Sequence, residues 1–344
     1  MRIFSPALLF VVLVSVSAPA LRGQGGLTPP GPPGPVFKTL LQVEPRTPID
    51  SIPSNSLAAH FINQPGSYYL TTNLNLNGNR EGIRVQASDV TIDLNGFTIF
   101  GHTNNVGIVA GIAGIKNVRI CNGILSRWAS AIDFGAFPSA SNIVVEDIRV
   151  DGGVPGLTNR PGIAVSSASV VRRCNVFGNF GFTTSGIEAN AGSVIEQCSV
   201  FDGNIGISLF GQARVENCWV QNASTTGISA ADPSTIRNNH VLACGIGILV
   251  ASNSWVADNF VDSSTSDGIR MTASYNRIER NFVVNSASAY RMGFSATTNF
   301  LVQNVSQRNV GSYTFVGGSI IGGPIVIMSS NVTTTSPWVN FSVP

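Results

Sequence analysis

The 344-residue chain can bury a large core, because 43% of its residues are hydrophobic. Only 11% of the residues are charged and 36 are glycine, a composition that favours β-structure with many turns over a helical protein. The formal net charge of +2 gives no reason to expect a nucleic-acid partner. The five cysteines are odd in number and lack CxxC spacing, which argues against a disulfide framework and against a zinc site.

The N-terminus predicts export. Residues 1–20 have the pattern of a secretory signal peptide, with a basic Arg2, an apolar run over residues 7–14, and small residues at Ala18 and Ala20. Neither this run nor any later one is long enough to span a membrane. We therefore expect an exported protein without a membrane span, located outside the cell, at its surface or in the periplasm.

Residues 21–66 are expected to tether and cover the domain that follows. Residues 21–35 contain the Pro/Gly-rich string GQGGLTPPGPPGP and predict a flexible linker. Residues 36–66 lack the repeat of the later chain and are predicted to cap the N-terminal end of a solenoid, whose end strands need cover. Within this cap, LAAHF at residues 57–61 is expected to form one helical turn.

Two short strings alternate over residues 67–309. The first is six residues long, as in VENCWV at residues 215–220, and its closing valine recurs every 20 to 26 residues from Val150 to Val283. The second usually begins with Gly-Ile, as in GISL at residues 206–209. These second strings begin at Gly82, Gly107, Ala131, Gly162, Gly186, Gly206, Gly227, Gly247, Gly268 and Ala289. Such a period, with short strands and Gly or Asn corners, is typical of a solenoid.

The apolar patterns of the two strings define the coil. GISL alternates as a strand does, whereas VENCWV has apolar residues at its first, fourth and sixth positions, so we expect a corner inside it. The sequence therefore predicts an all-β fold, a right-handed parallel β-helix of about ten coils over residues 67–309. Residues 310–344 lose the repeat again and are predicted to form a C-terminal cap.

Stacked coils turn equivalent positions of the six-residue string into columns about 4.8 Å apart. The fourth position predicts an inward stack of free thiols and of left-handed, hydrogen-bonded asparagines. Its members are Ile148, Cys174, Cys198, Cys218, Asn239, Asn259 and Asn281. The second position mostly alternates in charge and predicts a surface ion-pair ladder. Its members are Glu146, Arg172, Glu196, Glu216, Arg237, Ala257 and Glu279. The fifth position, which includes Trp219, is expected to face outwards or towards a covering segment.

Several terminal strings resemble a known group of proteins. VEPRTPI, QPGSYYLTTNL, VTIDLNGFTI and the closing SPWVNF are similar to those of exported bacterial right-handed parallel β-helix repeat proteins, a group without an established activity. The resemblance runs from about Val36 to the C-terminus and implies the pectin-lyase-like fold. Larger proteins of that fold include pectate lyases, polygalacturonases and polysaccharide epimerases.

The catalytic motifs of those larger proteins are not conserved in this sequence. SDGIRM at residues 266–271 resembles the polygalacturonase string NTDGID, but Arg270 replaces its second acid and the next coil, SAYRM, lacks an acid pair. The GHG string that accompanies this polygalacturonase motif does not occur, and neither does the DPHE string of the alginate epimerases. Hydrolysis by the polygalacturonase route is therefore not expected.

Asp133 and Glu188 form the first candidate for chemistry. The position after each Gly-Ile pair points outwards, and there Asp133 and Glu188 are separated by one coil that carries Ala164. Their backbones should lie about 9.6 Å apart. Inverting glycosidases use two carboxyl groups about 6.5–9.5 Å apart, so this pair is predicted to be catalytic.

The surroundings of this pair suggest a binding groove. The coil from Ala131 to Gly162 carries an extra loop with Asp151 and Arg160, which we expect to bind substrate. Aromatic side chains suit sugar rings and gather in the same coils, with the alternative that Phe134 and others pack the core. They are Trp128, Phe134, Phe137, Phe177, Phe180 and Phe182, of which Trp128, Phe180 and Phe182 are predicted to contact substrate.

A second candidate lies near the end of the solenoid. Arg270 and Arg291 are expected to stack on adjacent coils with Asp267 at the strand entry. Two guanidinium groups so close need an anion between them, either an acidic sugar or an internal carboxylate such as Asp267. The three histidines, His60, His102 and His240, are scattered, and no metal site is predicted.

These features leave two functions open. One is an exported β-helix protein that binds a polysaccharide, acidic or neutral, through an outward groove, with or without cleaving it as a lyase or hydrolase. The other is a non-catalytic surface or adhesion rod, favoured by the tether and the missing motifs. No cofactor is expected, except calcium if the chemistry is that of a lyase.

Overall fold

The computed structural model divides the chain into two units, Met1–Glu44 and Pro45–Pro344. All the residues that the structure describes belong to the second unit. They are residues 46–76, 80–101, 104–136, 139–152, 160–178, 185–231, 233–293, 296, 298–315, 319–327 and 336–343. The expected signal peptide and linker, and the first residues of the expected N-terminal cap, lie outside them.

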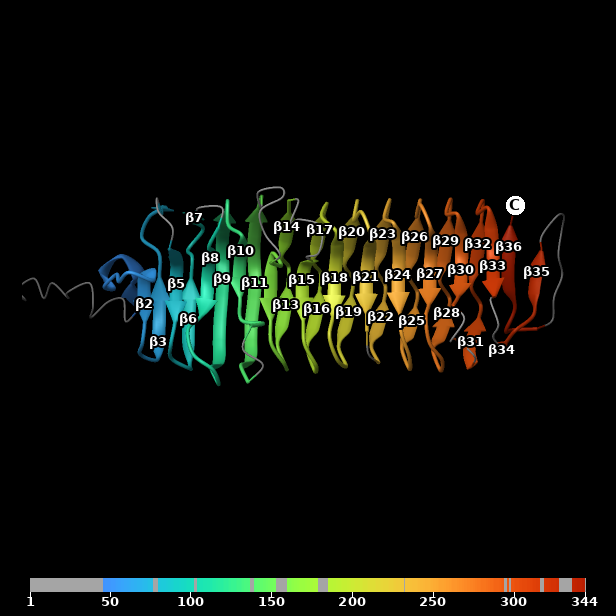
Figure 1. Ribbon diagram of the computed structural model, residues 1–344, viewed down its shortest axis with the longest axis horizontal. Coiled ribbons are helices and arrows are strands. Elements are labelled where there is room, and N and C mark those ends of the chain that lie inside the picture. The colour runs from blue at the N-terminus through green and yellow to red at the C-terminus, as the bar shows by residue number, and fades with distance from the viewer. Residues whose placement is uncertain are drawn as a thin grey trace, which may run out of the picture. The chain divides into compact units, whose positions relative to one another are not determined.

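Parallel strands build the second unit as a solenoid of two sheets (Figure 1). A 12-stranded sheet receives one strand from each coil. Its strands are β2 (Ala58–Ile62), β5 (Glu81–Val85), β8 (Val106–Ala110), β10 (Ser130–Asp133), β12 (Ile163–Val165) and β15 (Ser185–Ala189). They continue with β18 (Ile205–Leu209), β21 (Thr226–Ala230), β24 (Ile246–Val250), β27 (Asp267–Met271), β30 (Ser288–Met292) and β33 (Gly311–Phe315).

The second sheet has 24 strands and carries the six-residue strings. It starts with β1 (Thr47–Pro48), β3 (Gly66–Tyr69), β4 (Leu74–Asn75), β6 (Val90–Asp93), β7 (Thr98–Phe100), β9 (Lys116–Ser126) and β11 (Ser141–Asp151). The middle coils give β13 (Val170–Arg172), β14 (Asn175–Phe177), β16 (Val194–Glu196), β17 (Ser199–Phe201), β19 (Arg214–Glu216), β20 (Trp219–Gln221), β22 (Thr235–Arg237) and β23 (His240–Leu242). The last coils give β25 (Trp255–Ala257), β26 (Phe260–Asp262), β28 (Arg277–Glu279), β29 (Phe282–Val284), β31 (Thr298–Val302), β32 (Val305–Gln307), β34 (Ser319–Gly322), β35 (Ile325–Ile327) and β36 (Asn340–Val343).

Helical structure is almost absent from the described residues. They contain one 3-10 turn, η1 at Ile49–Ser51. The helical turn expected at residues 57–61 is wrong, because Ala58–Ile62 forms β2 and pairs in parallel with β5. None of the helical structure among these residues is long and apolar enough to cross a membrane.

The corner expected inside each six-residue string is confirmed. In VENCWV, β19 ends at Glu216 and β20 begins at Trp219, and Asn217 between them has a positive φ of 55°. The left-handed residue is thus the third position of the string, and the expectation that it is the fourth is wrong. Asn238 and Asp258 occupy the same place in the next coils, with φ of 55° and 58°. Asn and Asp tolerate this conformation better than most residues do.

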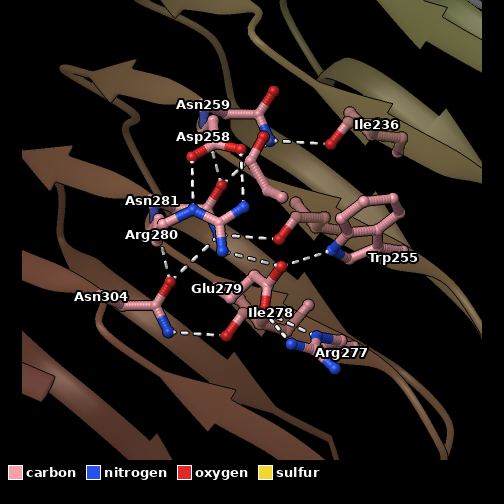
Figure 2. A network of polar contacts seen from close by, with 12 residues as sticks. Ile236, Trp255, Asp258, Asn259, Arg277, Ile278, Glu279, Arg280, Asn281 and Asn304 are labelled. Carbon is pink, nitrogen blue, oxygen red and sulfur yellow. Dashed lines mark hydrogen bonds and ion pairs between the residues drawn. The ribbon is translucent and has the colours of Figure 1, made fainter. Parts of the chain in front are cut away.

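The fourth position points into the core and forms a ladder, as predicted. The side-chain amide of Asn259 donates to Oδ1 of Asn281 at 2.9 Å, and Asn281 donates to Oδ1 of Asn304 at 3.0 Å (Figure 2). Asn340, on β36, accepts in turn from Asn304. Cys174, Cys198, Cys218 and the two other cysteines are buried free thiols, so the expected thiol stack is also confirmed.

The second position confirms one part of its expectation and corrects the other. Ion pairs do join neighbouring coils, from Glu146 to Arg172 and from Glu216 to Arg237. Three of the four glutamates, Glu146, Glu216 and Glu279, are buried rather than at the surface, and only Glu196 is partly exposed. Glu146 and Glu279 are each only 2% exposed. Glu279 accepts from Arg277, Arg280 and the indole N–H of Trp255 (Figure 2). Burial alone would raise the pKa of this carboxyl, but the hydrogen bonds from Arg277 and Trp255 outweigh it and hold the pKa below 4.5.

The parallel pairing also runs further than the repeated strings. Sheet strands already occur at β1 and β2, and they continue through β33 to β36. This sheet has 12 strands instead of the ten expected from the repeated strings, because one strand precedes the first string and one follows the last. Each of these two strands, AAHFI and GSYTF, lacks the Gly-Ile signature.

Candidate functional site

The outward column of the 12-stranded sheet contains both predicted carboxyl groups. Asp133 of β10 pairs in register with Ala164 of β12, and Ala164 pairs with Glu188 of β15. The predicted column is therefore correct, with a backbone separation of two strand spacings, about 9.6 Å. The small Ala164 leaves open space between the two acidic side chains.

Asp133 is held in one orientation. One carboxylate oxygen accepts from Arg160 Nη1 at 3.0 Å, and the other accepts from the backbone N–H groups of Gly135 and Ala136, both at 3.2 Å. The Asp133 side chain is 8% exposed, whereas that of Arg160 is 50% exposed. The loop residue Arg160 thus joins the candidate site, as the sequence suggests.

Glu188 lies in a different electrostatic environment. Burial raises the pKa of its carboxyl above 4.5, the negative charge of Asp133 adds to the shift, and a hydrogen bond from Ser185 opposes it. No arginine compensates for this burial among the described residues. The two carboxyl groups of this column therefore differ in their partners, and the raised pKa of Glu188 is the kind of shift that suits a proton donor.

A pocket of about 470 Å³ joins these groups. Asp133, Arg160 and Glu188 line it together with Asn190 and Phe210. The sequence analysis did not identify Asn190 and Phe210. Each directly follows a strand of the 12-stranded sheet, Asn190 after β15 and Phe210 after β18. Phe210 is 47% exposed, and its position directly after the GISL string is the feature from which the sequence could have predicted it as a lining residue.

Other predicted substrate-binding residues lie elsewhere. Trp128 is 2% exposed and donates its indole N–H to the carbonyl of Ile99, so its expected contact with a polysaccharide is corrected to a core position. Asp151 ends β11 in the other sheet and pairs with Arg149 at 2.7 Å, outside the pocket lining. Phe134 is a core residue at 0% exposure, as the alternative held. Phe177 ends β14 in the other sheet and stacks on Phe201, outside the pocket lining. The other predicted aromatics Phe137, Phe180 and Phe182 lie outside the described residues.

The second candidate site is internally neutralised. Arg270 and Arg291 are paired neighbours in β27 and β30, as predicted. The buried carboxylate of Asp267 binds Arg270 closely and lies 3.9 Å from Arg291. The described residues therefore supply the anion that the arginine pair needs, which was the internal alternative of the sequence analysis.

Metal ligands do not gather in the described part of the chain. There, no group of three or more histidine, cysteine, aspartate or glutamate side chains is placed to hold a metal ion. His60 lies on β2 and His240 on β23, whereas His102 falls outside the described residues.

Comparison with protein families identifies the chain. The sequence model of one family, described as "Periplasmic copper-binding protein (NosD)", matches residues 138–323, which is more than half of the 344 residues. The protein belongs to the NosD family. No curated protein matches this NosD-family chain in sequence.

Solved structures support the fold of this NosD-family protein. The A-module of the Azotobacter vinelandii mannuronan C-5 epimerase AlgE6 has a TM-score of 0.56 at 12% identity, over 81% of this chain and 89% of that one. The AlgE4 A-module from the same organism has 0.54 at 12% identity, over 80% and 86%. An exopolygalacturonase from Thermotoga maritima has 0.51 at 11% identity, over 74% and 84%. At such low identity the similarity establishes a shared right-handed parallel β-helix fold and nothing about activity.

Proposed function

We propose that this protein is exported, binds a polysaccharide in the pocket on β10, β12 and β15, and cleaves it with Glu188 and Asp133. The observation that carries the proposal is the unequal carboxyl pair. Glu188 has a raised pKa in a partly buried position, whereas Asp133 is ion-paired with Arg160, and one pocket joins them. Phe210 offers an apolar wall and Asn190 a hydrogen-bonding amide, a combination typical of small-molecule pockets.

The proposed chemistry is inverting hydrolysis. Glu188 donates a proton to the glycosidic oxygen, the bond between that oxygen and the anomeric carbon breaks, and Asp133 accepts a proton from the water that attacks the anomeric carbon. Asp133 and Glu188 lie two strand spacings apart, about 9.6 Å between their backbones, and the pocket that they share offers room for the attacking water. The half-exposed guanidinium of Arg160 orients Asp133 through their ion pair.

Copper binding, which the family description names, does not fit the described residues. Copper prefers imidazole and thiolate ligands. The described histidines His60 and His240 lie on different coils, and the five cysteines are buried in the core. Burial raises the pKa of Cys244 to about 11, which disfavours the thiolate needed for a metal. We therefore derive no step through copper.

Product analysis tests the proposal. We expect the mature protein to release reducing ends from at least one member of a panel of uronate and neutral polysaccharides. Glu188→Gln should lower this rate by about 100-fold or more, because general acid catalysis contributes about 10²–10⁴-fold. Unsaturated products that form only with calcium would instead indicate a lyase, and no product from any polymer would refute cleavage.

A non-catalytic rod is the second candidate, and one observation favours it. Both carboxylate oxygens of Asp133 are already occupied by Arg160 and by two backbone N–H groups, as expected of a residue that fixes a loop. In that case Asp133→Asn would lower the melting temperature while the wild-type protein binds polysaccharide without releasing product.

A further inference from the structure

An aromatic column lies on the outward face of the 24-stranded sheet, away from the strands that carry Asp133 and Glu188. Trp219, His240, Phe260 and Phe282 begin β20, β23, β26 and β29 and are paired neighbours in register. Their successive ring centroids are 4.0, 4.7 and 5.5 Å apart. Trp219 stands at one end of this column and is 37% exposed.

The neighbouring coil leaves one side of Trp219 open. Its register partner on that side is Ser199 of β17, which has no ring to stack on the indole. Two residues further along the same strand, Phe201 points to the same face and stacks on Phe177 at 4.7 Å. Trp219 therefore ends the ring stack, with Ser199 beside it on the side away from His240.

A column of polar corner residues runs beside the aromatic column. Gln197, Asn217 and Asn238 are exposed, and their side-chain amides hydrogen-bond to no other residue within the described ranges. The corners on either side of these three are satisfied differently. Arg173 pairs with Asp147 at 2.8 Å, and Arg280 pairs with Asp258 at 2.7 Å (Figure 2). Three consecutive amides are thus left available for a ligand.

The two columns are the walls of one groove of about 600 Å³. Ser199, Trp219, His240 and Phe260 line one side, and Gln197, Asn217, Asn238 and Asp258 line the other. The lining carries little free charge, because Asp258 is ion-paired with Arg280. Burial also lowers the pKa of His240, against the weaker opposite effect of Asp262, so its imidazole is neutral at pH 7.

We propose that this groove is a second carbohydrate site, which binds an uncharged polysaccharide chain along the solenoid axis. Sugar rings present C–H faces that pack on aromatic side chains, and their hydroxyl groups need both donors and acceptors, which amides supply. The coils repeat these groups about every 4.8 Å, so successive sugars of a polymer meet similar walls. This groove shares no lining residue with the Asp133–Glu188 pocket.

Binding of neutral oligosaccharides tests this site. The probes are cellohexaose, xylohexaose and mannohexaose, with a galacturonate hexamer as the charged probe, followed by calorimetry and tryptophan fluorescence. We expect the wild-type protein to bind at least one neutral probe with an affinity insensitive to salt. Trp219→Ala should weaken that binding about tenfold or more, since exposed aromatics at binding sites contribute this much.

A second variant keeps the test independent of folding. Asn217→Asp preserves size and tolerance of the left-handed backbone but removes the N–H donors, and it should weaken binding several-fold. Tyr275→Ala, at an exposed aromatic outside the groove, should bind the neutral probes as the wild type does. The proposal is overturned if the wild type binds no neutral probe, or if both groove variants retain full affinity. Loss of product with Glu188→Gln but intact groove binding would show that the two sites are separate.

Discussion

The pKa values of Glu188 and Glu279 are shifted in opposite directions, because different side chains contact the two carboxyl groups. Glu279 is enclosed by Arg277, Arg280 and the Trp255 indole, and its pKa is lowered. Glu188 has only the hydroxyl of Ser185 and a nearby negative charge, and its pKa is raised. A structural carboxylate and a candidate proton donor are thereby distinguished within one repeat architecture.

The raised pKa of Glu188 has a consequence for stability. Its folded-state pKa lies above the unfolded value of 4.5, so the folded protein binds more protons and loses stability as the pH rises through this window. Glu188→Gln should therefore raise the free energy of unfolding at pH 7, and this gain should vanish below pH 4.5. Urea denaturation at both pH values measures it. An equal gain at low pH would contradict the assignment.

The lowered pKa of Glu279 predicts the reverse. Its stabilising contribution is complete above the unfolded value of 4.5 and is lost as the pH falls through the folded pKa. Glu279→Gln should reduce the free energy of unfolding at pH 7 by about 1–3 kcal/mol, with a smaller difference in acid. Glu196→Gln is the matched control, since no ion pair to Glu196 occurs among the described residues. Equal effects of both variants would refute the role of the arginines.

At the scale of the strand and its corner, the sequence predicts most of the coil. The Gly-Ile strings mark ten strands of the 12-stranded sheet. Their isoleucines point into the core, as Ile228 of β21 and Ile248 of β24 do at 0% exposure. The strands AAHFI and GSYTF were missed because they lack that signature. The burial of Glu279 was not predicted, because a comparison of neighbouring coils finds no partner for it. Its partners Arg277 and Arg280 come from the same coil.

The site was partly predictable for the same reason. Register alone placed Asp133 and Glu188 in one column, since parallel pairing fixes which residues are neighbours. Trp128 could not be placed, because a residue outside the repeated strings has no register to assign it to a face. The contribution of Phe210 depends on the turn after β18, which no repeat specifies.

The glycine of each Gly-Ile string gives a prediction for this scale. A Cβ on Gly247 would lie 2.3 Å from Cγ1 of Val261 and 2.5 Å from the carbonyl oxygen of Gly268. Gly247→Ala should therefore destabilise the fold by about 1–3 kcal/mol, as overpacked cores do. Gly293→Ala is the control, because its Cβ would lie 3.6 Å from the nearest atom. Thermal unfolding compares them, and similar melting temperatures would contradict the packing account.

At the scale of the whole solenoid, the two candidate binding surfaces lie on different sheets. The pocket around Glu188 lies on the 12-stranded sheet and includes Arg160 and Pro161 from the connection between β11 and β12, and the aromatic groove lies on the 24-stranded sheet. The buried ladders of asparagine and thiol side chains between them are structural and repeat from coil to coil. Because the side chains of both surfaces stand on paired strands, the strand pairing holds them at fixed spacings.

We propose above that the Asp133–Glu188 pocket holds a sugar at its carboxyl pair. A crystal structure of the Glu188→Gln variant, soaked with an oligosaccharide of the polymer that the wild type cleaves or binds, tests this most directly. We expect a sugar between β10 and β18, with its glycosidic oxygen within hydrogen-bond reach of the substituted side chain and with Phe210 against a ring. A sugar bound only at Trp219, with the Asp133 pocket filled by water alone, would contradict the claim.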